Sequence, residues 1–193
     1  MEKGDYLSAI LRSDRTVFST SDVSLLWQEA NQNAIRVRLN YYVRNSDLYQ
    51  IRKNFYSKDE NYDRMELANR LYSPSYISFE TVLAREGMVF QYSSVITVAA
   101  YLSRTVRVEG QQYSYRRIKE SILLAPDGLM INDAYSIASR ERAFLDMLYS
   151  SPGFYFDCLS GLDWDKVFDI LTIYKNKRLE KEINKMFREK DLA

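Results

Sequence analysis

Short runs of helix-capping and turn-forming residues divide the first sixty residues, and their spacing restricts the fold more than any other feature of the sequence. Apolar residues at helical spacing from Asp5 onward end at Ser13-Asp14, a polar pair that suits a helix end and a turn. Val17-Phe18 then predicts a brief extended segment. The next residues, 19–22, offer several N-cap side chains for a second helix that includes Trp27.

A third helix and a hairpin are predicted in the same region. Asn31 is a candidate N-cap for the third helix. The apolar positions expected to form its buried stripe are Ile35, Leu39 and Val43. After the turn formers at residues 45–47, strand-like runs at 48–52 and 55–57 flank Lys53-Asn54, which is the pattern of a β-hairpin.

Helix, strand, helix, helix and hairpin is the element order of a winged helix-turn-helix domain, so we predict this fold for residues 1–60. In such a domain the third helix enters the major groove of DNA and the hairpin lies along the phosphates, so both should be basic. Residues 32–58 contain six basic residues and one acid, Asp47. Residues 1–31 contain three basic residues and five acids. Positive charge is therefore concentrated where DNA would bind.

The side chains of this basic region have the chemistry that DNA requires. Arginine presents a two-pronged donor to guanine, asparagine can bond adenine bidentately, and lysine suits phosphate. We predict that Arg36, Asn40 and Arg44 form a reading face. The full set of predicted DNA-binding residues is Asn33, Arg36, Arg38, Asn40, Arg44, Arg52 and Lys53. The alternative is that these are solvated charges on an exposed helix face. The tyrosines Tyr41, Tyr42, Tyr49 and Tyr56 are expected to pack, with their hydroxyl groups in water.

The polar run at residues 58–61 predicts a linker, and we place a domain boundary near residue 60. Residues 61–193 predict a mixed α/β domain, so the whole chain is expected to be α+β. Strands are predicted within 95–108 and at 112–118, with a turn at Pro126-Asp127-Gly128. Helix starts are predicted at Ser78, Ser139 and Asp163, a short helix is predicted before Pro74, and Gly87 is the predicted left-handed end of a helix.

The closing segment from Lys175 is predicted to be a basic helix with an apolar stripe at Leu179, Ile183 and Phe187. Such a tail could contact DNA, a partner or only water, and a solvated surface is favoured.

The sequence contains no histidine, which excludes histidine-based acid-base catalysis, Ser-His-Asp triads and histidine-ligated zinc. The single cysteine, Cys158, cannot form an internal disulfide. We therefore predict a protein that is not an enzyme and has no cofactor or metal site. A metal-dependent nuclease would start from Asp127 with Asp133 or Glu141 as its second carboxylate. Residues 135–138 lack the acid and lysine that such a site needs, so a plain turn is favoured.

Apolar runs are all far shorter than the roughly 18 residues that a membrane-spanning helix requires. The first five residues are acidic and polar, unlike a secretory signal. We therefore expect a cytoplasmic protein without membrane contact, and one cysteine agrees with a reducing compartment. The net charge of +1 gives no overall attraction to nucleic acid, so any basic surface must be local.

Three blocks in a fixed order carry a family resemblance. They are Arg-Lys-Asn-Phe-Tyr at 52–56, Pro-Ser-Tyr-Ile-Ser-Phe-Glu at 74–80 followed by Gly87, and Ile-Ala-Ser-Arg-Glu-Arg-Ala-Phe-Leu-Asp-Met-Leu-Tyr at 137–149. With these blocks the chain resembles the AbiEi-like antitoxins over roughly residues 5–150. Two positions depart from the family pattern: Asn54 stands where glycine is frequent in the wing turn, and Glu86 stands where histidine is frequent.

The resemblance implies an N-terminal winged helix-turn-helix and a C-terminal antitoxin domain, encoded in a type IV toxin-antitoxin or abortive phage-infection operon. It implies that the N-terminal domain binds operator DNA and represses its own operon. The C-terminal domain would counteract a nucleotidyltransferase-like toxin, and the two proteins need not touch. The alternative is a protein-interaction module that sequesters a partner toxin without specific DNA binding. Within the blocks, we expect Glu141-Arg142 to be a helix-surface pair and Tyr76, Ile77, Phe79, Ala143, Leu145 and Leu148 to pack.

Overall fold

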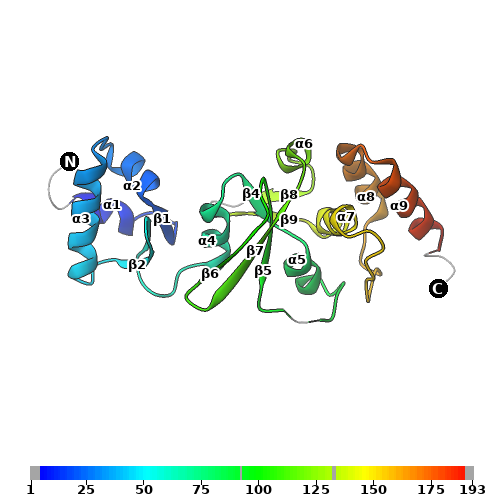
Figure 1. Ribbon diagram of the computed structural model, residues 1–193, viewed down its shortest axis with the longest axis horizontal. Helices are drawn as coiled ribbons and strands as arrows, with labels where there is room; N and C mark the ends of the chain where they lie inside the picture. The colour runs from blue at the N-terminus through cyan, green and yellow to red at the C-terminus, as the bar shows by residue number, and fades with distance from the viewer. Residues whose placement is uncertain (1–4, 92, 132–133, 190–193) are drawn as a thin grey trace.

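The computed structural model describes residues 5–91, 93–131 and 134–189. It is an α+β fold with a three-stranded sheet and a six-stranded sheet in the described part of the chain. The molecule is elongated (Figure 1). The first helices and the small sheet lie at one end, the large sheet lies in the middle, and the last helices lie at the other end.

Residues 5–57 form the first unit, and its elements follow the predicted order. They are α1 (Asp5–Leu11), β1 (Val17–Ser19), α2 (Thr20–Trp27), α3 (Gln32–Arg44), β2 (Tyr49–Arg52) and β3 (Phe55–Ser57). The strands form an antiparallel sheet in the order β1-β3-β2.

Side-chain caps explain where α2 and α3 begin. Ser19 and Asp22 form a capping box, in which the Ser19 hydroxyl accepts from the Asp22 backbone nitrogen and Asp22 accepts from the Ser19 nitrogen. Asn31 Oδ1 accepts from the backbone nitrogens of Asn33 and Ala34 at 3.0 and 3.2 Å. The predicted starts of both helices are confirmed, because these side chains satisfy backbone donors that have no partner within a helix.

The core of the first unit corrects one position of the predicted stripe on α3. Ile35 and Leu39 are fully buried as predicted, but the third buried residue is Tyr42 and not Val43. At 3.6 residues per turn, position 42 lies about 20° from Ile35 around the helix and position 43 about 80° away. Tyr42 therefore faces the core and contacts Trp27 edge-on, with ring centroids 6.4 Å apart.

The second unit contains a mixed sheet in the order β6-β7-β5-β4-β9-β8. Its strands are β4 (Ser75–Ile77), β5 (Ile96–Ala100), β6 (Arg104–Val108), β7 (Gln111–Arg117), β8 (Leu129–Ile131) and β9 (Ser136–Ala138). Its helices are α4 (Arg64–Leu71), α5 (Glu80–Arg85), α6 (Glu120–Leu123), α7 (Arg140–Ser150), α8 (Trp164–Leu171) and α9 (Lys177–Glu189), with a 3-10 turn at Thr172–Tyr174. The pairs β4-β9 and β5-β7 are parallel, and the others are antiparallel.

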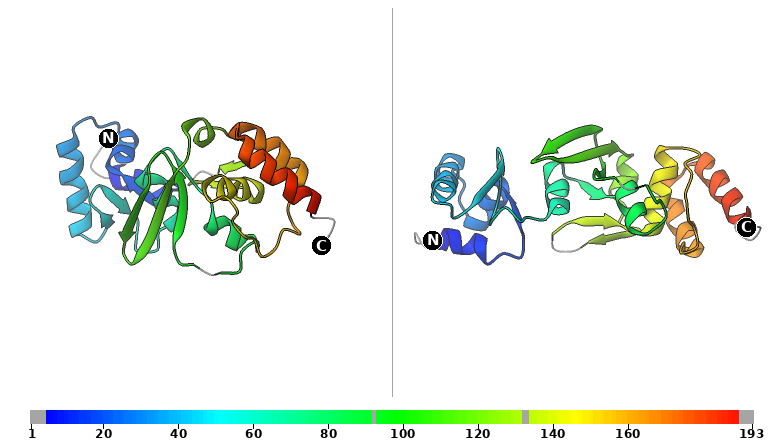
Figure 2. Two further views of the ribbon diagram at one scale, coloured as in Figure 1. Left: turned by 45° about the vertical axis from the view of Figure 1, so that its right-hand side comes forward. Right: turned by 90° about the horizontal axis from the view of Figure 1, so that it is seen from below.

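Both faces of the large sheet are covered, which is why all five residues of β5 are buried. One face meets α4, where the Tyr115 hydroxyl donates to the carbonyl of Ala68 at 2.7 Å. The other face meets α5 and α7, where Arg116 pairs with Glu80 at 2.5 Å. Figure 2 shows α4 between the first unit and the large sheet. Helix α4 is therefore the layer that joins the two units.

The region around α5 corrects a second prediction. Helix α5 begins after Phe79, whose φ is 58°, and Ser78 does not cap it. Instead the Ser78 hydroxyl donates to Asp146 Oδ2 at 2.8 Å. Gly87 follows the helix with φ of 70°, so the predicted left-handed position is confirmed.

The pair predicted on the surface of α7 is buried, so that prediction is wrong. Glu141 is 8% exposed and Arg142 is 0% exposed. Arg142 donates to the carbonyls of Ile122 and Asp127, both at 2.6 Å, and to the hydroxyl of Tyr76 at 3.0 Å. These partners lie 15 to 66 residues away in the chain, so the helix periodicity alone does not reveal them.

Asp146 is the anionic partner of Arg142 and is also fully buried. It accepts hydrogen bonds from the hydroxyls of Tyr76, Ser78 and Tyr174, the last at 2.6 Å. Burial raises the pKa of Asp146, while Arg142 and the three hydroxyl donors act in the opposite direction. This polar network joins two of the blocks that carry the family resemblance, residues 74–80 and 137–149.

Within the described ranges, no helix is both long enough and apolar enough to cross a bilayer.

Candidate nucleic-acid interface

Helix α3 presents a polar stripe on the side that faces away from the core of the first unit. Asn33, Arg36, Asn40 and Arg44 are all exposed and follow one another at intervals of three and four residues. Such intervals place side chains above one another on a helix. The structure therefore brings these four predicted residues together on one face.

The cations of this stripe have no counter-charge on their own helix, because α3 contains no acidic residue. Among the described residues, neither Arg36 nor Arg44 lies within ion-pair distance of a carboxylate. Arg70, Arg116 and Arg142 in the second unit are paired. Unpaired guanidinium groups beside exposed amides are suited to bind an anion that also offers hydrogen-bonding edges.

Arg38, also predicted to bind DNA, lies on a different side of α3. Its guanidinium carbon is 3.7 Å from the ring centroid of Tyr6 and 5.6 Å from that of Trp27. Arg38 is half-buried, and its Nη1 has no hydrogen-bond partner in the described residues. This cation-π contact fastens α1 and α2 to α3, so the geometry favours a packing role.

The hairpin separates the two basic residues predicted at its tip. Arg52 pairs in register with Phe55, on the sheet face that is turned toward the second unit. Burial raises the pKa of Tyr115 in β7 well above its ordinary value, and the positive charge of Arg52 offsets only part of this rise. Lys53 is exposed in the turn, next to Asn54, whose carbonyl accepts from the Thr20 nitrogen at 3.0 Å. Lys53 is therefore held near the start of α2, and Arg52 lies on the other face of the sheet from the α3 stripe.

Two exposed apolar residues on α3 were not predicted as part of the site. Val37 is 71% exposed and Tyr41 is 60% exposed. The Tyr41 ring packs only edge-on against Tyr42, with ring centroids 5.7 Å apart, so its expected packing is confirmed in part. Tyr42 and Tyr56 are buried as expected, and Tyr49 is half-buried. Val37 and Tyr41 line a shallow groove along α3. The groove is lined by Asn31, Asn33, Ala34, Val37, Arg38, Tyr41, Tyr42 and Asp47. Placing the sequence on a helical wheel would have found Val37, because it lies opposite Ile35.

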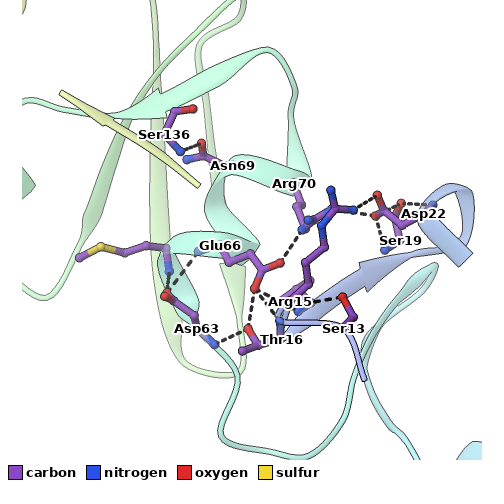
Figure 3. Close-up of polar contacts among 12 residues, drawn as sticks. Ser13, Arg15, Thr16, Ser19, Asp22, Asp63, Glu66, Asn69, Arg70 and Ser136 are labelled. Carbon is purple, nitrogen blue, oxygen red and sulfur yellow. Dashed lines mark hydrogen bonds and ion pairs between the residues drawn. The ribbon is translucent and has the colours of Figure 1, made fainter. Parts of the chain in front are cut away.

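A buried carboxylate connects the first unit to the second (Figure 3). Glu66 of α4 is fully buried, and its Oε2 accepts from the Thr16 nitrogen at 2.8 Å, the Thr16 hydroxyl at 2.7 Å and the Val17 nitrogen at 3.2 Å. Its Oε1 pairs with Arg70 Nε at 2.8 Å. The edge of the small sheet is therefore tied directly to the helix that covers the large sheet.

Arg70 extends this junction to the cap of α2. Its Nη1 lies 2.9 Å from Asp22 Oδ2, the same oxygen that accepts from Ser19. Burial raises the pKa of Asp22, but hydrogen bonds from Ser19 and the charge of Arg70 outweigh it, so the net pKa is lowered. The hollow between the units is lined in part by these residues and by Arg15, which also pairs with Asp22. Its charges are already matched, so we assign it to the junction.

A second contact links the hairpin to the large sheet. Glu109, in the turn between β6 and β7, accepts hydrogen bonds from the hydroxyl groups of Tyr49 and Tyr62. Burial and this hydrogen bond raise the pKa of Tyr62 well above its ordinary value. Together with the Glu66 junction, this contact sets the direction in which α3 points relative to the second unit.

The groups considered for metal chemistry do not form a cluster in the described ranges, where no group of three or more His, Cys, Asp or Glu residues is placed to hold a metal ion. Asp127 is exposed, and Glu141 is buried on α7. Asp133, the other carboxylate considered, lies outside the described residues.

Comparison of the chain with protein-family models gives no match. Comparison with curated proteins also gives no match.

Proposed function

We propose that this protein is a DNA-binding transcriptional regulator whose first unit is a winged helix-turn-helix. The element order α1-β1-α2-α3-β2-β3 and the sheet order β1-β3-β2 support this proposal. In that class of domain the helix corresponding to α3 lies in the major groove and the hairpin lies beside it. The connection between α2 and α3 is only residues 28–31, as short as such a turn requires.

The observation that carries the proposal is the exposed stripe of Asn33, Arg36, Asn40 and Arg44 on α3. Its arginines suit guanine or phosphate and its asparagines suit adenine. Because the whole chain has a net charge of +1, the attraction to DNA is confined to this local surface.

We further propose that the protein is an AbiEi-like antitoxin that represses its own operon and counteracts a nucleotidyltransferase-like toxin through its second unit. The three sequence blocks support this assignment. Two of the blocks pack on each other through Tyr76, Ser78 and Asp146, which is the arrangement expected if both belong to one domain. On this proposal the protein acts in the cytoplasm, is not an enzyme and needs no cofactor.

The test is binding of the purified full chain to the DNA upstream of its own gene, measured by fluorescence anisotropy against a scrambled duplex. The expected result is sequence-selective binding. The logarithm of the association constant should fall linearly with the logarithm of the salt concentration, because phosphate contacts release counterions. Equal affinity for both duplexes at every salt concentration would refute the regulator proposal.

The second candidate function is a protein-interaction module, and exposed leucines on α1 and α2 favour it, two of which, Leu25 and Leu26, line one hollow. Leu25 is 80% exposed, with Leu11 at 49% and Leu26 at 36%. Exposed apolar patches commonly mark protein contacts. This candidate predicts that Arg36→Ala and Arg44→Ala leave a stable complex with the partner toxin intact, whereas Leu25→Asp disrupts it.

A further inference from the structure

Val37 occupies the centre of the exposed face of α3. It lies about 160° around the helix from Leu39 and a similar angle from Ile35, the two fully buried residues of α3. It belongs to neither hydrophobic core, although it is a large apolar residue. A β-branched residue also has lower helix propensity than alanine, so Val37 stabilises neither the core nor the helix.

The neighbours of Val37 indicate what this side chain meets. Asn33 precedes it by one turn, and Asn40 and Arg44 follow on the same side of the helix. Arg36 and Arg44 carry unpaired positive charge, and α3 has no acid. Amide and cationic groups therefore flank Val37 on one side, and the exposed ring of Tyr41 lies on its other side. An apolar group beside cations and amides fits a polyanion that has its own apolar points better than it fits a purely apolar protein surface.

We propose that Val37 is a specificity residue that contacts the C5 methyl group of a thymine in the major groove. This inference rests on the proposed DNA-binding function and deepens it. Thymine is the base that presents an apolar group in that groove, and small apolar side chains recognise it. Val37 lies beside the stripe on the outward face of α3, so the methyl group would lie next to bases that Asn33, Asn40 and Arg44 can reach.

The experiment removes the methyl group from the DNA and the apolar group from the protein separately. A high-affinity duplex is selected from a random pool with the full-length wild-type protein, and each thymine is replaced in turn by uracil, which lacks only the C5 methyl. Wild-type protein, Val37→Ala and Val37→Thr are compared on every duplex. Leu124→Ala, at a 59% exposed apolar residue beyond α6 in the second unit, is the matched control.

The expected result is that uracil at one or two positions weakens binding of the wild-type protein by about three- to tenfold. Val37→Ala should bind the thymine and uracil duplexes equally well, and Val37→Thr, which keeps one methyl group, should retain part of the preference. Leu124→Ala should behave like the wild type. The thermal midpoint of Val37→Ala should not fall, because alanine is the better helix former.

Four outcomes would overturn the inference. Selective binding with no uracil effect at any position would refute the Val37 contact and leave the regulator proposal standing. A uracil effect that persists unchanged in Val37→Ala would assign the methyl contact to another residue. A Val37→Ala variant that weakens binding to all duplexes equally and changes oligomeric mass would show that Val37 lies in a protein contact. If the wild-type protein selects no sequence, the regulator proposal fails, and this inference fails with it.

Discussion

Glu66 Oε2 accepts a hydrogen bond from the backbone nitrogen of Thr16 at 2.8 Å, across 50 residues of sequence and across the boundary between the two units. The loop before β1 has no strand partner at this point, so a side chain from α4 satisfies its backbone. The carboxylate is fully buried and also holds Arg70. The position of α3 therefore depends in part on this glutamate of the other unit, together with the contact of Glu109 with Tyr49 and Tyr62.

Removing this carboxylate should destabilise the junction. Glu66→Ala leaves the nitrogens of Thr16 and Val17 and the guanidinium of Arg70 without their acceptor, so we expect the free energy of unfolding to fall by about 2–4 kcal/mol. Urea denaturation measures this loss. Glu60→Ala, at an exposed acid of the linker, is the control and should change stability by less than about 0.5 kcal/mol. Equal stability of the two variants would contradict a structural role for Glu66.

The junction should also weaken in acid through Asp22. Because its folded-state pKa lies below the ordinary value of 3.8, its contribution to stability is complete above that value and is lost as pH falls through the folded-state pKa. We expect the unfolding free energy to drop below about pH 4 with a steeper slope in the wild type than in Asp22→Asn. Urea titrations between pH 3 and 6 measure the slope. If Asp22→Asn and the exposed control Asp14→Asn have the same profile, the Asp22 contribution is refuted.

Replacing the arginines of the stripe should reduce affinity for a selected operator. Arg36→Ala or Arg44→Ala should each cost about 1–3 kcal/mol on the specific duplex if they read bases, with little change on a scrambled one. Competition anisotropy measures both affinities. Arg38→Ala serves as the contrasting variant, since its contact with Tyr6 predicts lower stability with base selectivity retained. If Arg38→Ala loses selectivity while Arg36→Ala and Arg44→Ala keep it, then Arg38 reads bases and the two stripe arginines do not.

Lys53 and Arg52 give a matched pair on the two sides of the hairpin. Lys53→Ala should weaken binding to all sequences. The plot of log affinity against log salt should also become shallower, its slope falling in magnitude by about 1, as expected for one lost phosphate contact. Arg52→Ala should leave the slope unchanged, because Arg52 pairs with Phe55 on the sheet face that is turned toward the second unit. Salt titrations of both variants against one duplex decide this, and an equal fall in slope would place both residues on the DNA.

The element order of the first unit follows from local chemistry. Ser19, Asp22 and Asn31 cap helices through contacts that span two or three residues, so their effect is visible in the sequence. The stripe of Asn33, Arg36, Asn40 and Arg44 was predictable for the same reason, because helix periodicity alone determines which residues share a face. In the second unit the caps at Ser139 and Asp163 were predicted correctly on the same basis.

The tertiary structure decided which polar residues are enclosed. The pair Glu141-Arg142 has the pattern of a helix surface, yet Arg142 is buried because Tyr76, Ile122 and Asp127 bring acceptors to it from other parts of the chain. Ser78 resembles a helix cap but donates to Asp146, 68 residues away.

The sequence by itself therefore determined the element order of the first unit, the helix caps at Ser139 and Asp163, and the composition of the α3 face, because these depend on neighbours within a turn or a hairpin. Only the tertiary structure decided the sheet face on which Arg52 lies, the packing of Arg38 and the junction at Glu66. Each of these depends on segments that meet after the chain has folded, and no local periodicity specifies which segments will meet.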